Sequence, residues 1–297
     1  MAVILLFIDG LGWGGTDPAV NPQHAYGGEL FRLPRLPGEG DDPVPLPRGG
    51  WARPVDAVLG VAGLPQSASG QTTLLSGVNA QAAIGQHLTG FPNEALRAIL
   101  LEHSVLRQLT RLGRRACFLN AFRPRFFEFP RERQLHFSAT TVANLAADLP
   151  FFGLDDIAAG RSIYQEFTNA ELQALGFDVP TLAPDDAGRV LGRAAAHYDF
   201  VLFEYFQSDK AGHGGAFARA CDELAKLDAF LAAALDAMPQ GTLLVVCSDH
   251  GNLEDMTTRR HTANPVPLMA WGPGAREFAA PLARLDEVTG AIVARLR

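Results

Sequence analysis

Residues 2–10 read AVILLFIDG, a run of seven apolar residues that ends at Asp9 and Gly10. The run is far shorter than the roughly 20 apolar residues needed to cross a bilayer, and it lacks the basic segment and cleavage site of a secretion signal. A short, continuous apolar run bounded by turn residues is typical of a strand buried on both faces. We therefore interpret residues 2–8 as the first strand of a parallel sheet.

Four more apolar runs of this kind follow along the chain, at 115–122, 199–206, 242–247 and 266–271. Segments with helical spacing lie between or after them, at 93–112, 186–197, 216–238 and from about 285 onward. Strands that alternate with helices predict a doubly wound α/β fold, with a mostly parallel sheet and helices on both of its faces. We expect residues 1–297 to form a single domain.

Two segments interrupt the alternation of strands and helices. Residues 16–53 are dense in proline and glycine and have little periodicity, which predicts a loop. Residues from about 123 to 185 carry weak helical patches, such as 140–148, and the pairs Phe126-Phe127 and Phe151-Phe152. We interpret this second segment as a small inserted cap, and we expect both segments to cover the active site.

The composition limits the class of protein. The chain is 47% hydrophobic and 19% charged, as in ordinary soluble globular proteins. Its net charge is −7 and its 25 basic residues are dispersed, which argues against nucleic acid as the main partner. The three cysteines lie in apolar stretches, so we expect reduced core thiols and a cytoplasmic protein with no membrane partner.

Polar residues follow several of the predicted strands. In open α/β sheets ligands bind outside the carboxyl ends of the strands, so polar residues at these ends are candidates for a site. The positions are Asp9, Asp209 and Asp249-His250. His213 stands four residues after Asp209, a spacing that puts both side chains on one face of a helix, and His261 precedes the last strand.

These residues supply three carboxylates and three imidazoles. Buried carboxylates without partners are very costly, and the basic residues nearest in sequence, Lys210, Arg259 and Arg260, would neutralise only part of them. Two divalent cations are the better explanation, and mixed oxygen and nitrogen ligands suit Zn²⁺ or Mn²⁺. Two such ions carry a charge of +4 against −3 from the three aspartates, and this excess would attract a small-molecule phosphate ester.

A candidate nucleophile lies in residues 65–73, PQSASGQTT, which precede Leu74-Leu75. Small residues before an apolar run predict a loop that enters a helix, where backbone N–H groups and the helix dipole favour an anion. A serine coordinated to a metal at this position would become a nucleophile. The chemistry alone leaves Ser67, Ser69 and Thr72 as alternatives.

Five motifs occur in the order and approximate spacing of the alkaline phosphatase superfamily: Asp9-Gly10, the turn at 67–71, Asp209-x-x-x-His213, Asp249-His250-Gly251-Asn252 and His261-Thr262. The last of them are particularly similar to those of cofactor-independent phosphoglycerate mutases and phosphopentomutases. The resemblance covers residues 1 to about 271, apart from the middle insertion. It implies a two-metal enzyme of phosphoryl transfer.

The resemblance also implies a role for each residue. One metal ion would be held by Asp209, His213 and His261, and the other by Asp9, Asp249, His250 and the nucleophile. The family's nucleophile stands three positions before the glycine of the turn, which selects Ser67. In the family mechanism this serine attacks phosphorus in line, and the phosphoseryl enzyme then transfers the group to water or to a second hydroxyl.

Two departures from the mutase pattern favour hydrolysis of a phosphomonoester or phosphodiester. Gln71 stands where the mutases have histidine, and the 141 residues between Ser67 and Asp209 are too few for the large domain that closes over the substrate in phosphoglycerate mutases. A mutase must shield its phosphorylated intermediate from water. The alternatives are a phosphosugar mutase, and a metal-binding member without catalysis. The proline and arginine that follow a sulfatase's modified residue are missing after Ser67.

The remaining polar residues give weaker indications. Arg123 and Arg125 are either a clamp for the substrate phosphate or a solvated pair in a loop, and Glu204 is a candidate for orienting Asp209. The other histidines are interpreted as surface or core residues: His24, His87, His103, His136 and His197.

Overall fold

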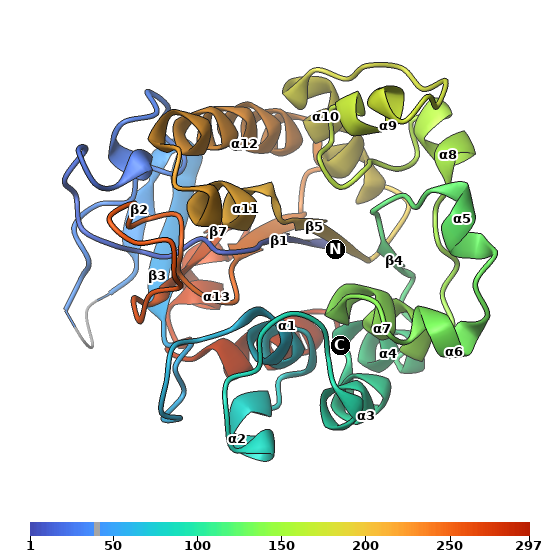
Figure 1. Ribbon diagram of the computed structural model, residues 1–297, viewed down its shortest axis with the longest axis horizontal. Helices are drawn as coiled ribbons and strands as arrows, with labels where there is room; N and C mark the ends of the chain where they lie inside the picture. The colour runs from blue at the N-terminus through green and yellow to red at the C-terminus, as the bar shows by residue number, and fades with distance from the viewer. Residues whose placement is uncertain (39–41) are drawn as a thin grey trace.

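In the part of the chain that the structure describes, seven strands form one sheet through the middle of the protein, in the order β2-β3-β7-β6-β1-β5-β4 (Figure 1). The structure is a computed structural model, and it describes residues 1–38 and 42–297. Residues 39–41 of the predicted loop lie outside the described residues. The strands are β1 (Val3–Ile8), β2 (Val44–Leu46), β3 (Gly50–Val55), β4 (Ala116–Phe118), β5 (Phe200–Tyr205), β6 (Leu243–Cys247) and β7 (Val266–Trp271).

Helices of very different length connect these strands. The first α-helices are α1 (Ser67–Ser76), α2 (Ala80–Ile84), α3 (Glu94–His103), α4 (Val105–Arg111), α5 (Pro124–Phe127), α6 (Arg131–Gln134) and α7 (Ala139–Ala146). They are followed by α8 (Leu154–Ala158), α9 (Ala170–Ala174), α10 (Pro184–Ala194), α11 (Gln207–Gly214), α12 (Phe217–Ala237), α13 (Ala275–Ala279) and α14 (Val288–Arg295). The 3₁₀ helices are η1 (Pro22–His24), η2 (Pro47–Gly49) and η3 (Leu285–Glu287).

The parallel half of the sheet sets the position of the candidate site. β1 pairs in parallel with β5 on one side and with β6 on the other, and β4 continues the parallel pairing beside β5. Ile8 lies beside Tyr205, and Phe7 beside Cys247, so the three strands end at the same edge. The predicted α/β fold is confirmed, and the segments that carry the acidic residues leave the sheet together.

The other half of the sheet is antiparallel, which the sequence did not indicate. β7 is antiparallel to β6, β3 to β7, and β2 to β3, so the sheet is mixed. β2 and most of β3 fall within residues 16–53, where the prediction of a loop was wrong. Pro45 and Pro54 lie within these strands, and proline removes a donor from the ladder, so it argues against a strand in sequence reasoning.

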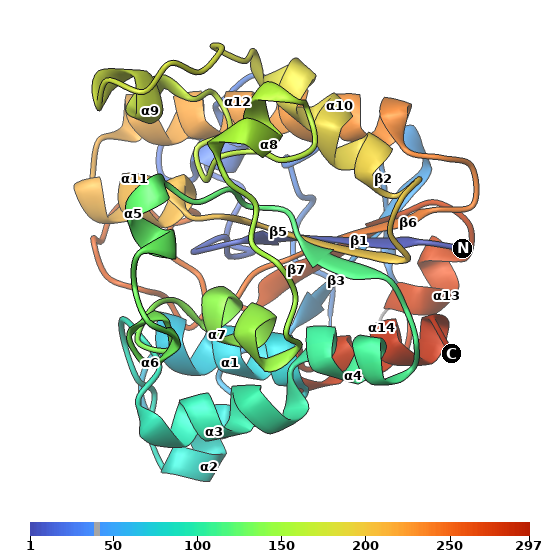
Figure 2. The same ribbon diagram turned by 90° about the vertical axis from the view of Figure 1, so that its right-hand side faces the viewer.

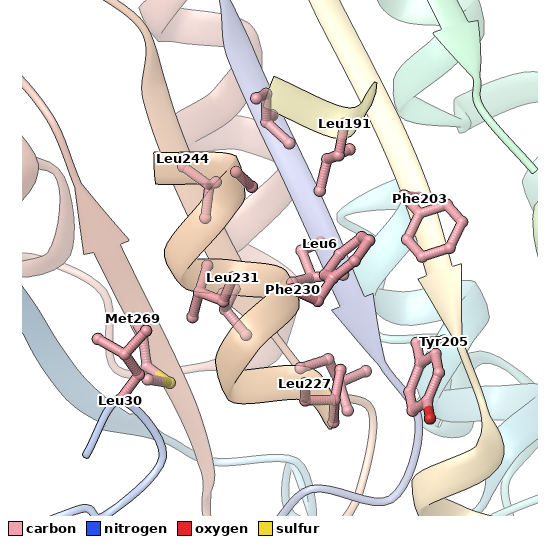
Figure 3. Close-up of a cluster of buried hydrophobic side chains, with 14 of the residues drawn as sticks. Leu6, Leu30, Leu191, Phe203, Tyr205, Leu227, Phe230, Leu231, Leu244 and Met269 are labelled. Atoms are coloured by element: carbon pink, nitrogen blue, oxygen red, sulfur yellow. The ribbon is translucent and has the colours of Figure 1, made fainter. Parts of the chain in front are cut away.

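Alternate residues of β1 face two different cores, one on each side of the sheet. Leu6 packs in a cluster with Leu227 and Phe230 of α12, and α10 covers the same face (Figure 3). Leu5 and Phe7 face the opposite cluster, which α1, α3, α4, α7, α13 and α14 cover. Figure 2 shows these two helical layers on either side of the sheet, so the prediction of helices on both faces is confirmed.

Two helical segments differ from their predicted form. The single helix expected at 93–112 is broken at Ser104, whose backbone is extended and whose side chain accepts a hydrogen bond from the Arg107 N–H as the cap of α4. Serine competes for backbone groups in this way, which makes it a common helix cap. Within 123–185, α7 is buried against α1 and α3 as part of the core, so the predicted insertion contains one core helix.

Two general features of the chain accompany this fold. Cys117, Cys221 and Cys247 are free thiols, as the sequence predicted, but only Cys117 and Cys247 lie in the core, since Cys221 is half-buried. A search of the described residues finds no helix with the length and apolar character required to span a membrane.

We predict that Gly188→Ala destabilises the protein and that Gly290→Ala does not. A Cβ at Gly188 of α10 would lie 2.1 Å from the Phe230 carbonyl oxygen of α12, so the two helices would have to separate. We expect the free energy of unfolding to fall by roughly 1–3 kcal/mol, measured by urea unfolding.

Gly290 of α14 is the matched control, because a Cβ there meets nothing within 4 Å. Alanine restricts the unfolded chain and favours the helix, so stability should rise by about 0.5–1 kcal/mol. Equal destabilisation by both substitutions would contradict the close packing of α10 on α12.

Candidate metal centre

The loops that follow β1, β5 and β6 are held together by hydrogen bonds between them. The Gly10 N–H donates to Asp249 Oδ1 at 3.3 Å, and the Leu11 N–H donates to Ser248 Oγ at 2.9 Å. The Ser208 hydroxyl donates to the Asp9 carbonyl oxygen at 2.6 Å. These contacts fix the backbone around Asp9 and Asp249, both of which are buried.

The N-terminus of α1 lies against the same loops. A Cβ at Gly70 would lie 2.7 Å from the Asp249 carbonyl oxygen, so the close approach requires glycine. Ser67 is the first residue of α1, and its Oγ lies 3.0 Å from His250 Nε2. Ser69 and Thr72 instead donate to the carbonyl oxygens of Gln66 and Ala68. Of the three hydroxyls that the chemistry left as alternatives, Ser67 is the one that faces His250.

His250 is at the centre of the first ligand group, which consists of Asp9, Ser67, Asp249 and His250. Its Nε2 lies 3.2 Å from Asp9 Oδ1 and 3.4 Å from Asp249 Oδ2. Both of these oxygens are buried with no hydrogen-bond partner among the described residues. One ring nitrogen cannot satisfy three oxygens, and an unpaired buried carboxylate is costly. A cation among these atoms would remove the deficit, so the group fits a metal ion.

The second ligand group consists of Asp209, His213 and His261. Asp209 and His213 both lie in α11, as predicted. His213 Nε2 lies 3.4 Å from Asp209 Oδ2. His261 Nε2 lies 3.1 Å from His213 Nε2 and 3.6 Å from Asp209 Oδ1. Ligand atoms around a tetrahedral ion at about 2.0–2.1 Å are roughly 3.3 Å apart. The three side chains therefore converge as metal ligands do.

Backbone carbonyls orient the histidine rings. His213 Nδ1 lies 2.7 Å from the Arg259 oxygen, and His261 Nδ1 lies 2.9 Å from the Pro65 oxygen. A proton on Nδ1 leaves Nε2 as a lone pair, which is the usual arrangement of a histidine that binds a metal. In both residues the free nitrogen faces the ligand group.

The two ligand groups adjoin each other. The rings of His250 and His261 stack with their centroids 3.7 Å apart. The ligand atoms of Asp209, His250 and His261 also lie within 4.8 Å of one another, so His250 borders both groups. Ser67 contacts His250, and the exposed His213 contacts His261, so all seven side chains predicted from the sequence lie in one cluster, whereas the other five histidines belong to neither group.

The charges of this cluster strongly shift its pKa values. Burial lowers the pKa of His250, but the carboxylates of Asp249 and Asp9 outweigh it and raise the pKa to about 10. Burial and the charge of Asp249 raise the pKa of Asp9 well above its usual value. Burial and the charge of His250 lower the pKa of His261 to about 4. In the metal-free protein, His250 and Asp9 therefore keep their protons to a higher pH than usual, whereas His261 loses its proton at a lower pH.

Two amides to which sequence reasoning gave no role in the site orient Asp9 and Asp209. The Gln71 Nε2 donates to Asp9 Oδ2 at 3.0 Å, and the Asn252 Nδ2 donates to Asp209 Oδ1 at 2.6 Å. Each amide leaves the other carboxylate oxygen turned toward a histidine. In the sequence, this role was indicated by the position of Gln71 in the turn at 67–71 and of Asn252 in the motif Asp249-His250-Gly251-Asn252.

Sequence reasoning missed Glu254, which joins three loops of the site. Its buried carboxylate accepts from the N–H groups of Gly12 at 3.0 Å and Asn252 at 2.8 Å. It also accepts from the Thr262 hydroxyl and from the Asn264 amide. Its contact with Gly12 joins residues 242 positions apart, so local pattern gave no sign that Glu254 connects these loops.

A cleft of about 920 Å³ opens beside the metal centre. Its lining includes Asp9, Ser67 and Asp209 of the cluster and the exposed Arg123 and Arg125. Figure 2 shows α5, α9 and α11 at the end of the sheet opposite the N-terminus.

The structure differs from two predictions about the surroundings of the site: that Glu204 orients Asp209, and that residues 16–53 cover the active site. Buried Glu204 lines the cleft but accepts from the Thr140 hydroxyl, whereas the carboxylate of Asp209 is held by Asn252. Burial raises the pKa of Glu204 to about 7. The described residues of 16–53 do not line this cleft. They pack on α12, where Tyr26 Oη donates to Asp228 at 2.7 Å.

A model of the Metalloenzyme superfamily matches residues 183–297. The 2,3-bisphosphoglycerate-independent phosphoglycerate mutase of Methanocorpusculum labreanum is 36% identical over 98 residues, and that of Cereibacter sphaeroides is 34% identical over 113 residues. These matches cover 33% and 35% of this chain, and 23% and 22% of the mutases. The match thus spans less than a quarter of each of these relatives.

Two solved alkaline phosphatases resemble the chain in fold. The enzyme of the Antarctic bacterium TAB5 has a TM-score of 0.53 at 15% identity, covering 100% of this chain and 98% of its own. That of a psychrophilic Shewanella species has a TM-score of 0.54 at 11% identity, covering all of both chains. At such identities the likeness shows the fold alone.

Residues 183–297 are therefore similar to the Metalloenzyme superfamily, and the chain has the α/β fold of the alkaline phosphatases. Part of the chain also resembles the cofactor-independent phosphoglycerate mutases, as the motifs indicated.

We predict that the protein binds two divalent ions per chain, and that substitutions in either ligand group remove about one of them. Asp249→Ala would empty the first group and His213→Ala the second. Each ion would be held by only four or three side chains, and each substitution removes one of them. His103→Ala, at the exposed end of α3, is the control and should retain both ions. Metal content would be measured by mass spectrometry after equilibration with Mn²⁺ or Zn²⁺. Full metal content in His213→Ala would contradict the second group.

We also predict that metal binding at pH 7 releases protons. His250, with a pKa of about 10, is protonated at pH 7 in the metal-free protein and must lose its Nε2 proton to bind a metal. Protons compete with the metal below the pKa, so affinity should rise with pH between about 6 and 9. Calorimetry in buffers of different ionisation enthalpy would show the release, and identical heats in all buffers would contradict it.

Proposed function

We propose that the protein transfers a phosphoryl group from a small phosphate ester to the hydroxyl of Ser67 and then to an acceptor. The observation that carries the proposal is the place of Ser67 Oγ, 3.0 Å from His250 Nε2 at the first residue of α1. A helix N-terminus favours the negative charge of an alkoxide or of a phosphoryl oxygen. The hydroxyl is half-buried, so a substrate in the cleft can reach it.

The reaction needs charge compensation that the ligand groups would supply. Two divalent ions, bound by Asp9, Ser67, Asp249 and His250 and by Asp209, His213 and His261, would lower the pKa of the serine hydroxyl and offset charge on the phosphoryl oxygens. The mixed oxygen and nitrogen donors suit Zn²⁺ or Mn²⁺.

The chain's own residues account for the remaining parts of the reaction. Ser67 Oγ gives up its proton to solvent and forms a bond to phosphorus as the bond to the ester oxygen breaks, and the leaving alkoxide takes up a proton from water in the open cleft. Arg123 and Arg125, which line the same cleft, would hold phosphoryl oxygens while the group moves. The acceptor then attacks phosphorus and releases Ser67.

Water is our first candidate for the acceptor. Exposed side chains, including Phe91 and Leu175, line the cleft, so it opens to solvent. The 141 residues between Ser67 and Asp209 form part of the core and a cap of short helices, which leaves little chain to enclose a phosphorylated intermediate. Hydrolysis of a phosphomonoester or phosphodiester follows from this openness.

A phosphosugar mutase is the second candidate, and the relatives favour it over hydrolysis. The similar proteins at 34–36% identity are phosphoglycerate mutases, whereas the likeness to alkaline phosphatases is one of fold. In this case a second hydroxyl of the substrate would take the phosphoryl group from Ser67. A metal-binding protein without catalysis would retain the ligands with no need for Ser67 beside them.

We predict that Ser67→Ala abolishes turnover and that Ser69→Ala does not. Removing the attacking oxygen should lower kcat by roughly a thousandfold or more on any ester that is turned over. Ser69 is the control because its hydroxyl donates to Gln66 within the same turn and does not face His250. The assay would use phosphomonoesters, phosphodiesters and sulfate esters with Mn²⁺ or Zn²⁺. If wild type exceeded Ser67→Ala on none of them, the proposed transfer would fail.

The acceptor can be identified in the same reactions. In water enriched in ¹⁸O, hydrolysis would release phosphate that carries one ¹⁸O atom. A mutase would instead yield an isomeric ester without release of labelled phosphate.

A further inference from the structure

The cleft beside the metal centre has an unusually aromatic lining. Eight of the chain's 19 phenylalanines line it, together with Tyr164. Phe122, Phe126 and Phe137 form its inner wall, with ring centroids 4.1 Å apart for the first pair and 5.4 Å for the last two. Edge-to-face and tilted contacts of this kind hold the rings in fixed orientations. The wall is therefore a preformed apolar surface that faces the same cleft as Ser67.

Packing within the protein does not account for all of these rings. Phe126 is buried and supports the cap, but Phe91 is 65% exposed at the edge of the cleft. Leu175, which follows α9, also lines the cleft and is 56% exposed. Exposed apolar side chains that gather around one opening indicate a binding site rather than a core.

Positive charges lie directly on some of the rings. The Arg133 guanidinium is 3.9 Å from the centroid of Phe129, and the Lys210 ammonium is 4.6 Å from that of Phe206. All four residues line the cleft. Planar guanidinium groups offer further surfaces on which an aromatic ring can stack, and their charge suits an anionic ester.

The size of the cleft agrees with a substrate larger than a three-carbon phosphate. At about 920 Å³ it lies near the upper end of the volumes of small-molecule sites. A short polar ester bound at Ser67 would leave the phenylalanine wall in contact with water, with no gain from burial.

We infer that the substrate is a phosphate ester whose alcohol part carries an aromatic ring, with the phosphoryl group at Ser67 and the ring on the phenylalanine wall. The inference rests on the proposed function for the position of the phosphoryl group. The aromatic ring would be that of a simple aryl group or of a nucleobase, because both present a flat apolar face.

The test compares pairs of esters that differ only in the ring. 2-Phenylethyl phosphate is paired with ethyl phosphate, and adenosine 5′-monophosphate with ribose 5-phosphate, so each pair has an alkyl leaving group of similar reactivity. Binding of the corresponding non-hydrolysable phosphonates to the wild-type protein in the presence of Mn²⁺ would be measured by calorimetry, and kcat/KM would be measured with the esters themselves. We expect the aromatic member of at least one pair to be favoured by about tenfold or more.

Two exposed phenylalanines provide matched variants. Phe91→Ala should reduce the preference for the aromatic ester, since Phe91 lines the same cleft as the phenylalanine wall and its exposed ring contributes little to folding. Phe127→Ala is the control, because Phe127 is 48% exposed on the neighbouring cap but does not line the cleft. A preference for both aromatic esters would indicate a general aryl site, and a preference for the nucleotide alone would indicate a nucleobase.

The outcomes separate this inference from the proposed function. Equal affinity within both pairs, or no binding of any phosphonate, would overturn the inference. Turnover of all esters at equal rates would also overturn the inference of an aromatic substrate, but it would support the proposed phosphoryl transfer. Aromatic preference in binding with no turnover would support the inference and count against the proposed transfer.

Discussion

The proximity of three carboxylates, two of them buried, is the constraint on which this structure depends. Asp9 and Asp249 are buried and Asp209 is half-buried close to them, and within residues 1–38 and 42–297 their ion-pair partners are histidines rather than arginines or lysines. Like charges at such distances raise the free energy of the folded protein unless cations or protons offset them. The arrangement is consistent with folding around divalent ions.

The surrounding residues hold this costly cluster in place. Parallel pairing of β1, β5 and β6 brings the acidic residues to one edge, and amides from Gln71 and Asn252 fix one oxygen on each of two carboxylates. Glu254 then joins the loops after β1 and β6 to the segment before β7. Orientation of ligands by such outer contacts commonly controls metal affinity, so these residues are as much a part of the site as the ligands.

Sequence reasoning succeeded where the signal was local. Buried strands such as 2–8 and the four-residue spacing of Asp209 and His213 follow from periodicity alone, and strand ends then indicate where polar residues gather. It failed at β2 and β3, where prolines within the strands hide the strand pattern, and it could not choose Ser67 from its neighbours on chemistry. Contacts such as that of Glu254 with Gly12 join residues 242 positions apart, and no local pattern encodes them.

The phosphoryl chemistry proposed for Ser67 depends first on whether metals occupy the two ligand groups. The most direct test is anomalous diffraction from crystals soaked in Mn²⁺. We predict two peaks, one bounded by Asp9, Ser67, Asp249 and His250, and the other by Asp209, His213 and His261. The absence of peaks at both positions, or a single peak elsewhere, would contradict a two-metal centre.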